Sequence, residues 1–305
     1  MTRLFVILAL LLGASPSYAL PGDMMLLGVS APAAGATYTG VGDVVAFTVY
    51  YSCTWAYKAT YAAATGKLCG ITRASDSETC DLLAATTGGE GLTANCSGAD
   101  NGKPLATFLT ATTGTWTKAY NQVANGTLDL PASATQPTIV LNCLGSLTCV
   151  QVSANGVNFA STTNITPSNG QGTMLGYSNR VSGTGVSADV EDNAAGGLSE
   201  LRRTTGTGNS CTLAGSSGTF NATCSDNAWH ALLSGTGSGT NNSLISVDGT
   251  ETPGTVTGNT SAGHVEVAIG ANSTTFKWIE AGVIDGSVVN STVRAALIAN
   301  MQARN

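Results

Sequence analysis

The sequence predicts an all-β sandwich that ends in a short helix. Only 10% of the residues are charged, whereas Gly, Ser, Thr and Ala are abundant. β-branched residues suit strands and Gly suits the turns between them, so this composition favours strands over long helices. The segment 229–285 consists of short apolar or alternating runs, each closed by Gly, Asn or Asp. Such runs are typical of consecutive antiparallel strands.

Composition also excludes several classes of protein. Apolar residues make up 43% of the chain and the net charge is −6, so the chain has enough apolar surface to fold. Its 12 Lys and Arg form no cluster larger than Arg202-Arg203. We therefore expect neither nucleic acid nor an anionic membrane as a partner. A chain of 305 residues can form one large all-β domain.

The first 19 residues have the pattern of a signal peptide. Arg3 precedes an apolar run over 4–13, which is too short to cross a membrane, and small residues stand at Ser17 and Ala19. We predict cleavage after Ala19 and a secreted, periplasmic or cell-surface protein without a membrane span in the mature chain. Residues 20–42 are small and nearly uncharged, which predicts an N-terminal arm or linker. The domain is expected over 43–305.

The first half of this domain mixes strand and helix signals. We expect a strand over 44–51, a helix-like piece over 55–64 and a strand over 70–73. Short strand or turn segments follow at 103–108 and 115–122. Residues 136–153 predict a β-hairpin that turns at Leu144-Gly145-Ser146.

The second half shows a clearer alternation. Asp248-Gly249 suits a tight turn, and Val265, Val267 and Ile269 alternate with other residues in the next strand. A Trp strand, a strand ending in V-D-G, a strand ending in A-I-G-A-N and a last strand with F-x-x-x-E occur in that order, which resembles the closing half of a concanavalin A-like jelly roll. Apolar positions three or four apart then predict a helix over 291–304, with Asn290 as its N-cap.

Eight cysteines allow four disulfides and agree with an oxidising destination. Cys143–Cys149 and Cys211–Cys224 bracket turns, so we expect each pair to bridge a hairpin. Cys80–Cys96 and Cys53–Cys69 are the remaining predicted pairs. No C-x-x-C occurs and both histidines are far from the cysteines, so we predict no metal site and no cofactor.

Four segments form a recognisable set: an Ala- and Tyr-rich helix, an R-x-S-D segment at 73–76, a Y-x-Q-x-x-x-G-x-x-D-L-like segment at 120–130 and a Q-P-x-x-V strand at 136–140. Together they resemble glycoside hydrolase family 54, the α-L-arabinofuranosidase B family. This resemblance covers most of 43–289. It implies a concanavalin A-like sandwich, α-L-arabinofuranose as the type of substrate, and a retaining mechanism with two carboxylates.

The residues expected to catalyse that reaction are not where the family has them. The family's nucleophile is a Glu shortly after two adjacent cysteines, and this sequence has no such pair. The family's acid/base is an Asp after I-G-G, where this chain reads Ile269-Gly270-Ala271-Asn272, and an amide cannot donate a proton to a leaving group. Glu191, Glu280 and Asp285 remain as catalytic candidates. The alternative places Glu280 on the solvent face of its strand and Asp285 in a turn with Gly286.

The predicted ligand-binding residues follow from the same segments: Tyr120, Asn121, Gln122, Asp129 and Asn272. Aromatic residues with a polar rim suit sugar rings, although most are expected in the core. Trp229 and Trp278 are predicted core residues.

Neither His230 nor His264 stands near a nucleophile motif, so the sequence predicts no hydrolase triad. The function predicted overall is an exported protein on an arabinofuranosidase-like jelly roll that binds carbohydrate. One alternative is an active retaining arabinofuranosidase with a non-standard carboxylate pair. The other is a structural or adhesive surface protein.

Overall fold

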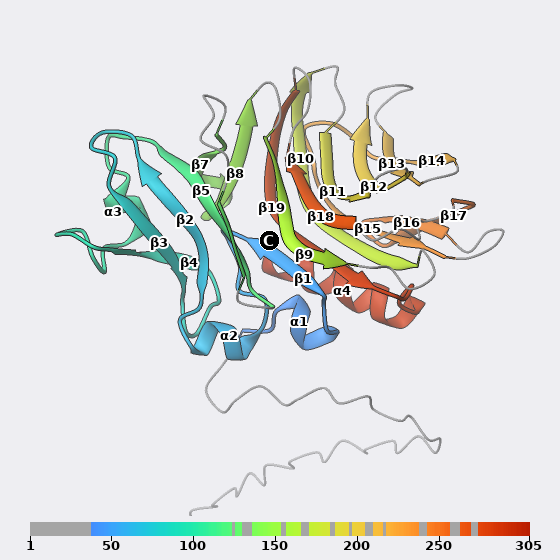
Figure 1. Ribbon diagram of the computed structural model, residues 1–305, viewed down its shortest axis with the longest axis horizontal. Coiled ribbons are helices and arrows are strands. Elements are labelled where there is room, and N and C mark those ends of the chain that lie inside the picture. Colours follow the sequence, from blue (N-terminus) through green and yellow to red (C-terminus); the bar gives the residue numbers. More distant parts are fainter. Residues whose placement is uncertain are drawn as a thin grey trace, which may run out of the picture.

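A computed structural model describes residues 38–123, 126–129, 136–153, 157–165, 171–183, 187–194, 197–204, 210–215, 218–237, 243–256, 263–269 and 274–305. The predicted signal peptide and Asn272 lie outside these residues. Two antiparallel sheets form the architecture, and the helices at 41–44, 59–63 and 291–304 lie along its lower side (Figure 1). The prediction of an all-β jelly-roll sandwich with a C-terminal helix is therefore confirmed.

The larger sheet contains thirteen strands in the described part of the chain. In spatial order they are β17 (Thr250–Gly254), β16 (Ser243–Val247), β15 (Trp229–Thr236), β10 (Gly172–Gly183), β19 (Thr274–Asp285), β8 (Leu147–Ser153), β7 (Thr138–Leu144), β5 (Gly114–Asn121), β2 (Lys67–Arg73), β3 (Thr79–Ala84) and β4 (Gly91–Cys96), with β1 (Val49–Ser52) paired to β19 and β6 (Gly126–Asp129) paired to β5. The predicted hairpin is β7–β8, and Gly145 at its turn has φ +59°.

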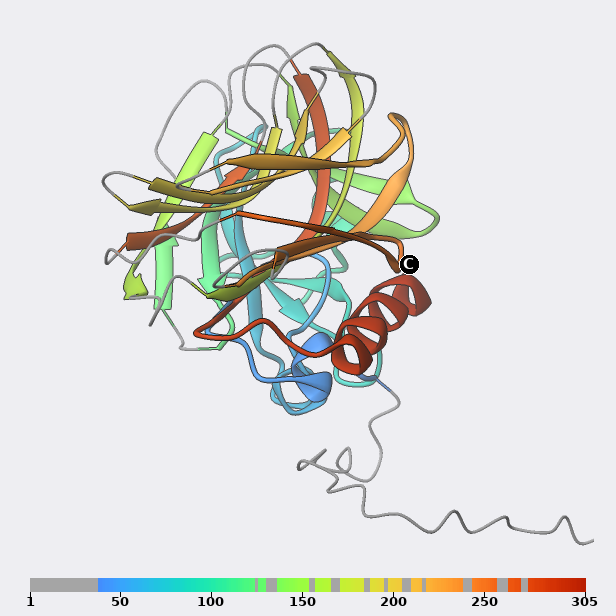
Figure 2. The same cartoon turned by 90° about the vertical axis from the view of Figure 1, so that its right-hand side faces the viewer.

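The smaller sheet has six strands in the same described residues. In spatial order they are β14 (Thr219–Thr223), β13 (Ser210–Ala214), β12 (Gly197–Thr204), β11 (Ser187–Ala194), β18 (Gly263–Ile269) and β9 (Val157–Ile165). Figure 2 shows this sheet above the strands β15–β17 of the larger sheet. Strands β2–β4 lie at the other end of the molecule in Figure 1.

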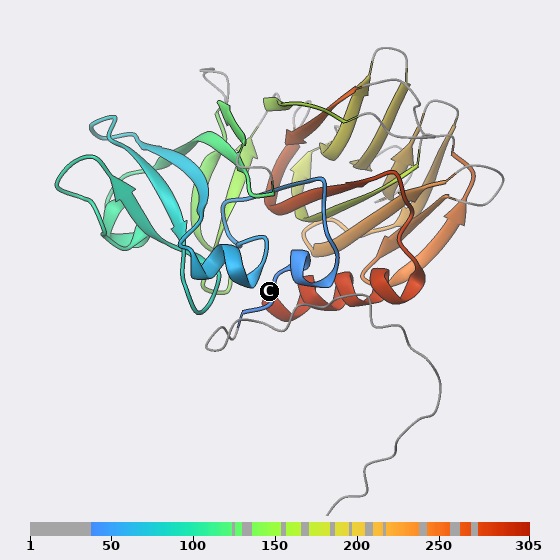
Figure 3. The same cartoon turned by 60° about the horizontal axis from the view of Figure 1, so that its bottom comes forward.

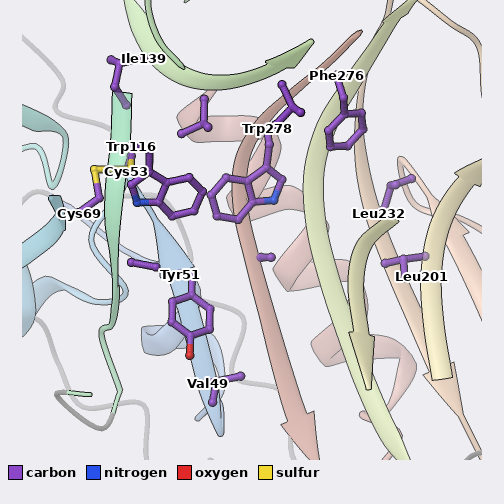
Figure 4. Close-up of a cluster of buried hydrophobic side chains, with 14 of the residues drawn as sticks. Val49, Tyr51, Cys53, Cys69, Trp116, Ile139, Leu201, Leu232, Phe276 and Trp278 are labelled. Carbon is purple, nitrogen blue, oxygen red and sulfur yellow. A yellow bond between two sulfur atoms is a disulfide. The ribbon is translucent and has the colours of Figure 1, made fainter. Parts of the chain in front are cut away.

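A first apolar core fills the space between the sheets and continues under β2–β5. Trp278 of β19 is fully buried and stacks on Trp116 of β5, with ring centroids 5.3 Å apart (Figure 4). Leu201 of β12 and Leu232 of β15 approach from the right-hand side of this view. Trp278 is therefore a core residue as predicted, whereas Trp229 is partly exposed and stacks on Tyr177 at 5.6 Å.

A second core lies on the opposite face of the larger sheet, beneath α4 (Ser291–Arg304). Leu297, Ile298 and Met301 of this helix are buried. The Asn290 side chain accepts a hydrogen bond from the Val293 N–H at 3.0 Å, so the predicted N-cap is confirmed. Figure 3 shows α4 running along the base of the molecule beside α1 (Val41–Val44).

The N-terminal elements differ from the sequence prediction. Residues 41–44 form α1, and the strand predicted over 44–51 is reduced to β1. The helix predicted over 55–64 is reduced to α2 (Ala59–Ala63), and α3 (Leu105–Phe108) replaces a predicted strand or turn. Asp43 explains part of this, because its Oδ2 accepts the N–H groups of Gly40 at 2.9 Å and Ala59 at 2.8 Å at the starts of α1 and α2.

Packing begins before Asp43, within the predicted arm. Tyr38 is 5% exposed and stacks on Trp55 at a centroid distance of 5.9 Å. Val41 is fully buried in the second core. These two side chains therefore belong to the folded unit.

All four predicted disulfides are present: Cys53–Cys69, Cys80–Cys96, Cys143–Cys149 and Cys211–Cys224. Glu78 lies near the sulfur atoms of Cys80 and Cys96, but those thiols are bonded to each other and cannot act as thiolate ligands. Within the described ranges, no helix has the length and apolar character needed to cross a membrane.

Candidate functional site

A pocket of about 480 Å³ opens between the α2–β2 turn and the end of β5. We call it the tyrosine pocket, and its lining residues are Tyr61, Ala64, Thr65, Gly66, Lys67, Tyr120 and Asn121. Two of the residues predicted to bind ligand, Tyr120 and Asn121, therefore line one pocket. Its size lies within the range of small-molecule sites.

Asp81 of β3 organises the polar side of the tyrosine pocket. Its carboxylate accepts a hydrogen bond from Tyr120 Oη at 2.5 Å and lies 2.7 Å from Lys67 Nζ. The Lys67 ammonium also lies 5.6 Å from the centre of the Tyr120 ring, within cation–π range. These contacts fix the Tyr120 ring and leave charged groups at its edge.

Tyr61 supplies the second ring of the tyrosine pocket. Its hydroxyl donates to the Lys67 carbonyl at 2.7 Å, and burial raises its pKa to about 12. The phenol is therefore neutral over the physiological range. Gly66 makes room for this ring, because a Cβ at position 66 would lie 2.1 Å from Tyr61 Cε1.

The amide side chains next to Tyr120 hold the backbone of the preceding segment. Gln122 Oε1 accepts from the Tyr57 N–H at 2.6 Å, and its Nε2 donates to the carbonyls of Ser52 and Trp55, both at 3.1 Å. Asn121 Oδ1 accepts from the Val123 N–H at 3.1 Å. Gln122 thus fastens the loop after β1 rather than lining the pocket.

The other two predicted ligand-binding residues lie elsewhere. Asp129 is in β6, directly opposite Lys118 of β5 in the strand register. Asn272 lies outside the described residues.

Glu280 is not on a solvent face, and that expectation was wrong. Its side chain is fully buried on the α4 side of the larger sheet. Both carboxylate oxygens accept from Arg304 Nη2, at 2.8 and 2.9 Å, and Oε2 also accepts from the Tyr50 hydroxyl. Burial and the nearby Glu280 charge raise the pKa of Tyr50. Glu280 thus anchors the end of α4.

Asp285 lies at the end of β19, next to Gly286, as the alternative prediction had it. Burial raises the pKa of its carboxyl. A hydrogen bond from the Gly286 backbone lowers this pKa, but burial has the larger effect. Five residues separate Asp285 from Glu280, a distance of about 16 Å along a strand at about 3.3 Å per residue. Because a retaining pair needs carboxyls about 5 Å apart, these two cannot form one.

Glu191 is in β11 of the smaller sheet, where the strand register gathers acidic residues. It lies directly opposite Glu200 of β12 on one side and Glu266 of β18 on the other. Glu280 is on the larger sheet, where Arg304 of α4 binds its carboxylate. We call Glu200, Glu191 and Glu266 the glutamate row.

A second pocket, of about 450 Å³, lies where the end of β14 meets β15–β17. His230, Ser225 and Asp248 line it together. His230 Nδ1 lies 2.6 Å from Asp248 Oδ2, and His230 Nε2 lies 3.2 Å from Ser225 Oγ. Sequence reasoning missed this cluster, although its members lie within 24 residues of one another, because no nucleophile motif surrounds them. The V-D-G turn at Asp248 was the single usable signal.

Comparison with known proteins gives no match to any protein-family model or curated protein. Among solved structures, the chain is similar to a GH54 α-L-arabinofuranosidase soaked with a cyclic sulfate inhibitor, with a TM-score of 0.64 and 16% identity. A second similar structure is an arabinofuranosidase complexed with arabinofuranosyl-α-1,2-xylobiose, with a TM-score of 0.63 and 16% identity. Both alignments cover 87% of this chain, which spans 65% of the length of each structure. The protein therefore has the jelly-roll sandwich fold of glycoside hydrolase family 54.

Proposed function

We propose that this protein acts outside the cytosol and binds carbohydrate through the tyrosine pocket. The observation that carries the proposal is the arrangement of Tyr61 and Tyr120 with the Lys67–Asp81 ion pair around one pocket. Tyrosine rings offer apolar faces to a sugar ring, and the charged groups at their edges can bind its hydroxyls. Four disulfides support an oxidising, extracellular destination.

Arabinofuranose-substituted xylo-oligosaccharides are the first ligands to test. A structure with this fold was solved with arabinofuranosyl-α-1,2-xylobiose bound. Calorimetry on protein lacking residues 1–19 should compare this trisaccharide with xylobiose and free arabinose. We expect saturable binding of the substituted oligosaccharide.

Three variants locate the site. Tyr120→Ala removes the ring and its bond to Asp81, and we expect about tenfold weaker binding, equivalent to 1.4 kcal/mol. Tyr120→Phe keeps the ring and should lose less. Trp229→Leu changes a partly exposed aromatic residue elsewhere and should bind normally. Binding that is absent in the wild type, or unchanged in Tyr120→Ala, would refute the proposal.

The glutamate row supports a second candidate function, retaining glycoside hydrolysis. Residues directly opposite each other in antiparallel strands generally have Cβ atoms about 4.5–5.5 Å apart. A retaining glycosidase needs two carboxyls about 5–5.5 Å apart, and glutamates on neighbouring strands are candidates for such a pair.

Release of arabinose from aryl α-L-arabinofuranosides tests this candidate. Glu191→Gln, Glu200→Gln and Glu266→Gln should each be measured, with Asp285→Asn as the control. Turnover that Glu191→Gln abolishes and Asp285→Asn leaves intact would establish hydrolysis. Absent turnover with intact glycan binding would leave the binding function alone.

The adhesive alternative finds less support. Leu92, 49% exposed, is the one large apolar side chain exposed in the described part of the chain. An adhesive surface of the usual kind needs a contiguous apolar patch of several hundred Å².

A further inference from the structure

The second pocket holds three side chains in the order of a charge-relay system. Asp248 Oδ2 lies 2.6 Å from His230 Nδ1, and His230 Nε2 lies 3.2 Å from Ser225 Oγ. A carboxylate can only accept hydrogen bonds, so Nδ1 carries the hydrogen that faces Asp248. In the neutral imidazole Nε2 then accepts from the Ser225 hydroxyl, whereas in the imidazolium it donates to the Ser225 carbonyl at 3.1 Å. We propose that Ser225, His230 and Asp248 form a nucleophilic triad that hydrolyses small carboxylic esters.

Asp248, the acidic member of this triad, is held in its ionised form. Burial raises the pKa of Asp248, but hydrogen bonds from His230 and the Ala231 N–H outweigh this and lower it below its usual value. The Ala231 N–H donates to Oδ1 at 2.9 Å, which leaves Oδ2 for the histidine. An ionised, oriented carboxylate fixes the histidine tautomer and stabilises the imidazolium that forms during reaction.

The nucleophile stands at a rigid position. Cys224, the residue before Ser225, is tied to Cys211 by a disulfide. Asp226, the residue after it, accepts two hydrogen bonds from Arg180, from Nε and Nη2, both at 2.6 Å. Arg180 is 1% exposed, so this clamp is anchored in the protein interior. Ser225 itself is exposed and can meet a substrate.

The chemistry needs only the ester and water. His230 Nε2 takes the Ser225 Oγ proton as Oγ attacks the acyl carbon, and the imidazolium then returns this proton to the departing alcohol. Water hydrolyses the acyl-serine by the same route. The Ser225 carbonyl, 3.1 Å from Nε2, can accept a hydrogen bond from the imidazolium between these steps.

The pocket walls indicate the class of ester. Besides the triad, the lining consists of Ala222, Thr223, Cys224, Val247, Thr250 and Thr252. These residues are small and carry no net charge, which suits an uncharged ester with a short acyl group such as acetyl. The pocket is separate from the tyrosine pocket, so this activity does not depend on the proposed sugar binding.

The test uses a fluorophosphonate probe, which labels activated serines, together with turnover of 4-nitrophenyl acetate. Mass spectrometry of the labelled wild-type protein should place the phosphonate on Ser225. Ser225→Ala should abolish labelling and turnover. His230→Gln and Asp248→Asn should reduce turnover by on the order of 10³-fold or more.

Two controls separate chemistry from folding. Ser287→Ala removes another exposed serine and should react as the wild type does. In Asp248→Asn the carbonyl oxygen can still accept from Ala231, so the protein should fold with a modestly lower thermal midpoint while its turnover falls far more. Labelling at residues other than Ser225, or turnover that survives in Ser225→Ala, would overturn the proposal.

Discussion

Glu280 has a different environment in the structure from the one that its sequence position predicts. The sequence contains 18 acidic residues, and Glu280 is the one in the last predicted strand that we expected on a solvent face. In the fold it is fully buried and bound by Arg304, which is itself 7% exposed at its side chain. A buried carboxylate keeps its charge at tolerable cost only when a partner compensates it.

Removal of one partner should therefore be costly. We expect Arg304→Met, which leaves Glu280 buried without its cation, to lower the free energy of unfolding by about 3–5 kcal/mol. Lys103→Met, at a side chain that is 44% exposed, should change it by less than about 1 kcal/mol. Urea denaturation measures both. Equal small effects would mean that the Glu280–Arg304 pair does not hold α4.

Gly66 offers a second prediction at the residue scale. A methyl group there would meet the Tyr61 ring, so Gly66→Ala should displace that ring and weaken glycan binding by on the order of tenfold. Gly88→Ala is the matched control, because a Cβ at Gly88 meets nothing within 4 Å. Calorimetric titration with the glycan measures binding by both variants. Normal binding by Gly66→Ala would show that Tyr61 does not contribute to the site.

At the scale of elements, α4 behaves as its sequence indicates. The apolar positions Leu297 and Met301 are four residues apart and both are buried, and Asn290 caps the helix. Ion pairs fasten it near both ends, with Arg294 Nε 2.6 Å from Glu251 Oε1 and Arg304 bound to Glu280. Helix start signals and periodicity are local properties, which is why the sequence alone predicted this element.

The cap can be tested alone. Asn290→Ala should lower the free energy of unfolding by about 1 kcal/mol, because the Val293 N–H loses its acceptor. Asn290→Ser retains an oxygen acceptor and should cost less than half as much. Thermal melts of both proteins measure the difference, and equal melting temperatures would argue against the cap.

The stability of the whole molecule should depend on acid. Hydrogen bonds from Arg294 lower the pKa of Glu251, and those from His230 and Ala231 outweigh burial and lower that of Asp248. A carboxyl with a lower pKa in the folded state binds more protons when unfolded, so its stabilisation is present above about pH 5 and is lost as the pH falls. Burial acts oppositely on Asp285, whose pKa is raised.

We therefore expect the thermal midpoint to fall between about pH 5 and pH 3. Glu251→Gln should reduce this slope, because it removes one of the contributing carboxyls. Calorimetry across this pH range provides the measurement. A midpoint that rises on acidification would show that Asp285 and similar buried carboxyls dominate.

The sequence by itself determined the closing strands of the sandwich, the β7–β8 hairpin, the capped terminal helix and the four disulfides. These are short-range features: alternation reports which side of a strand is buried, and each disulfide joins residues 6 to 16 apart. Tertiary structure alone decided the sites. Tyr50 meets Glu280 across 230 residues, and Tyr120 meets Asp81 across 39. His230 meets Asp248 because β15 pairs with β16 and brings the turn beside it. Which polar groups meet depends on strand order and register, and alternation within one strand does not identify its partner strand.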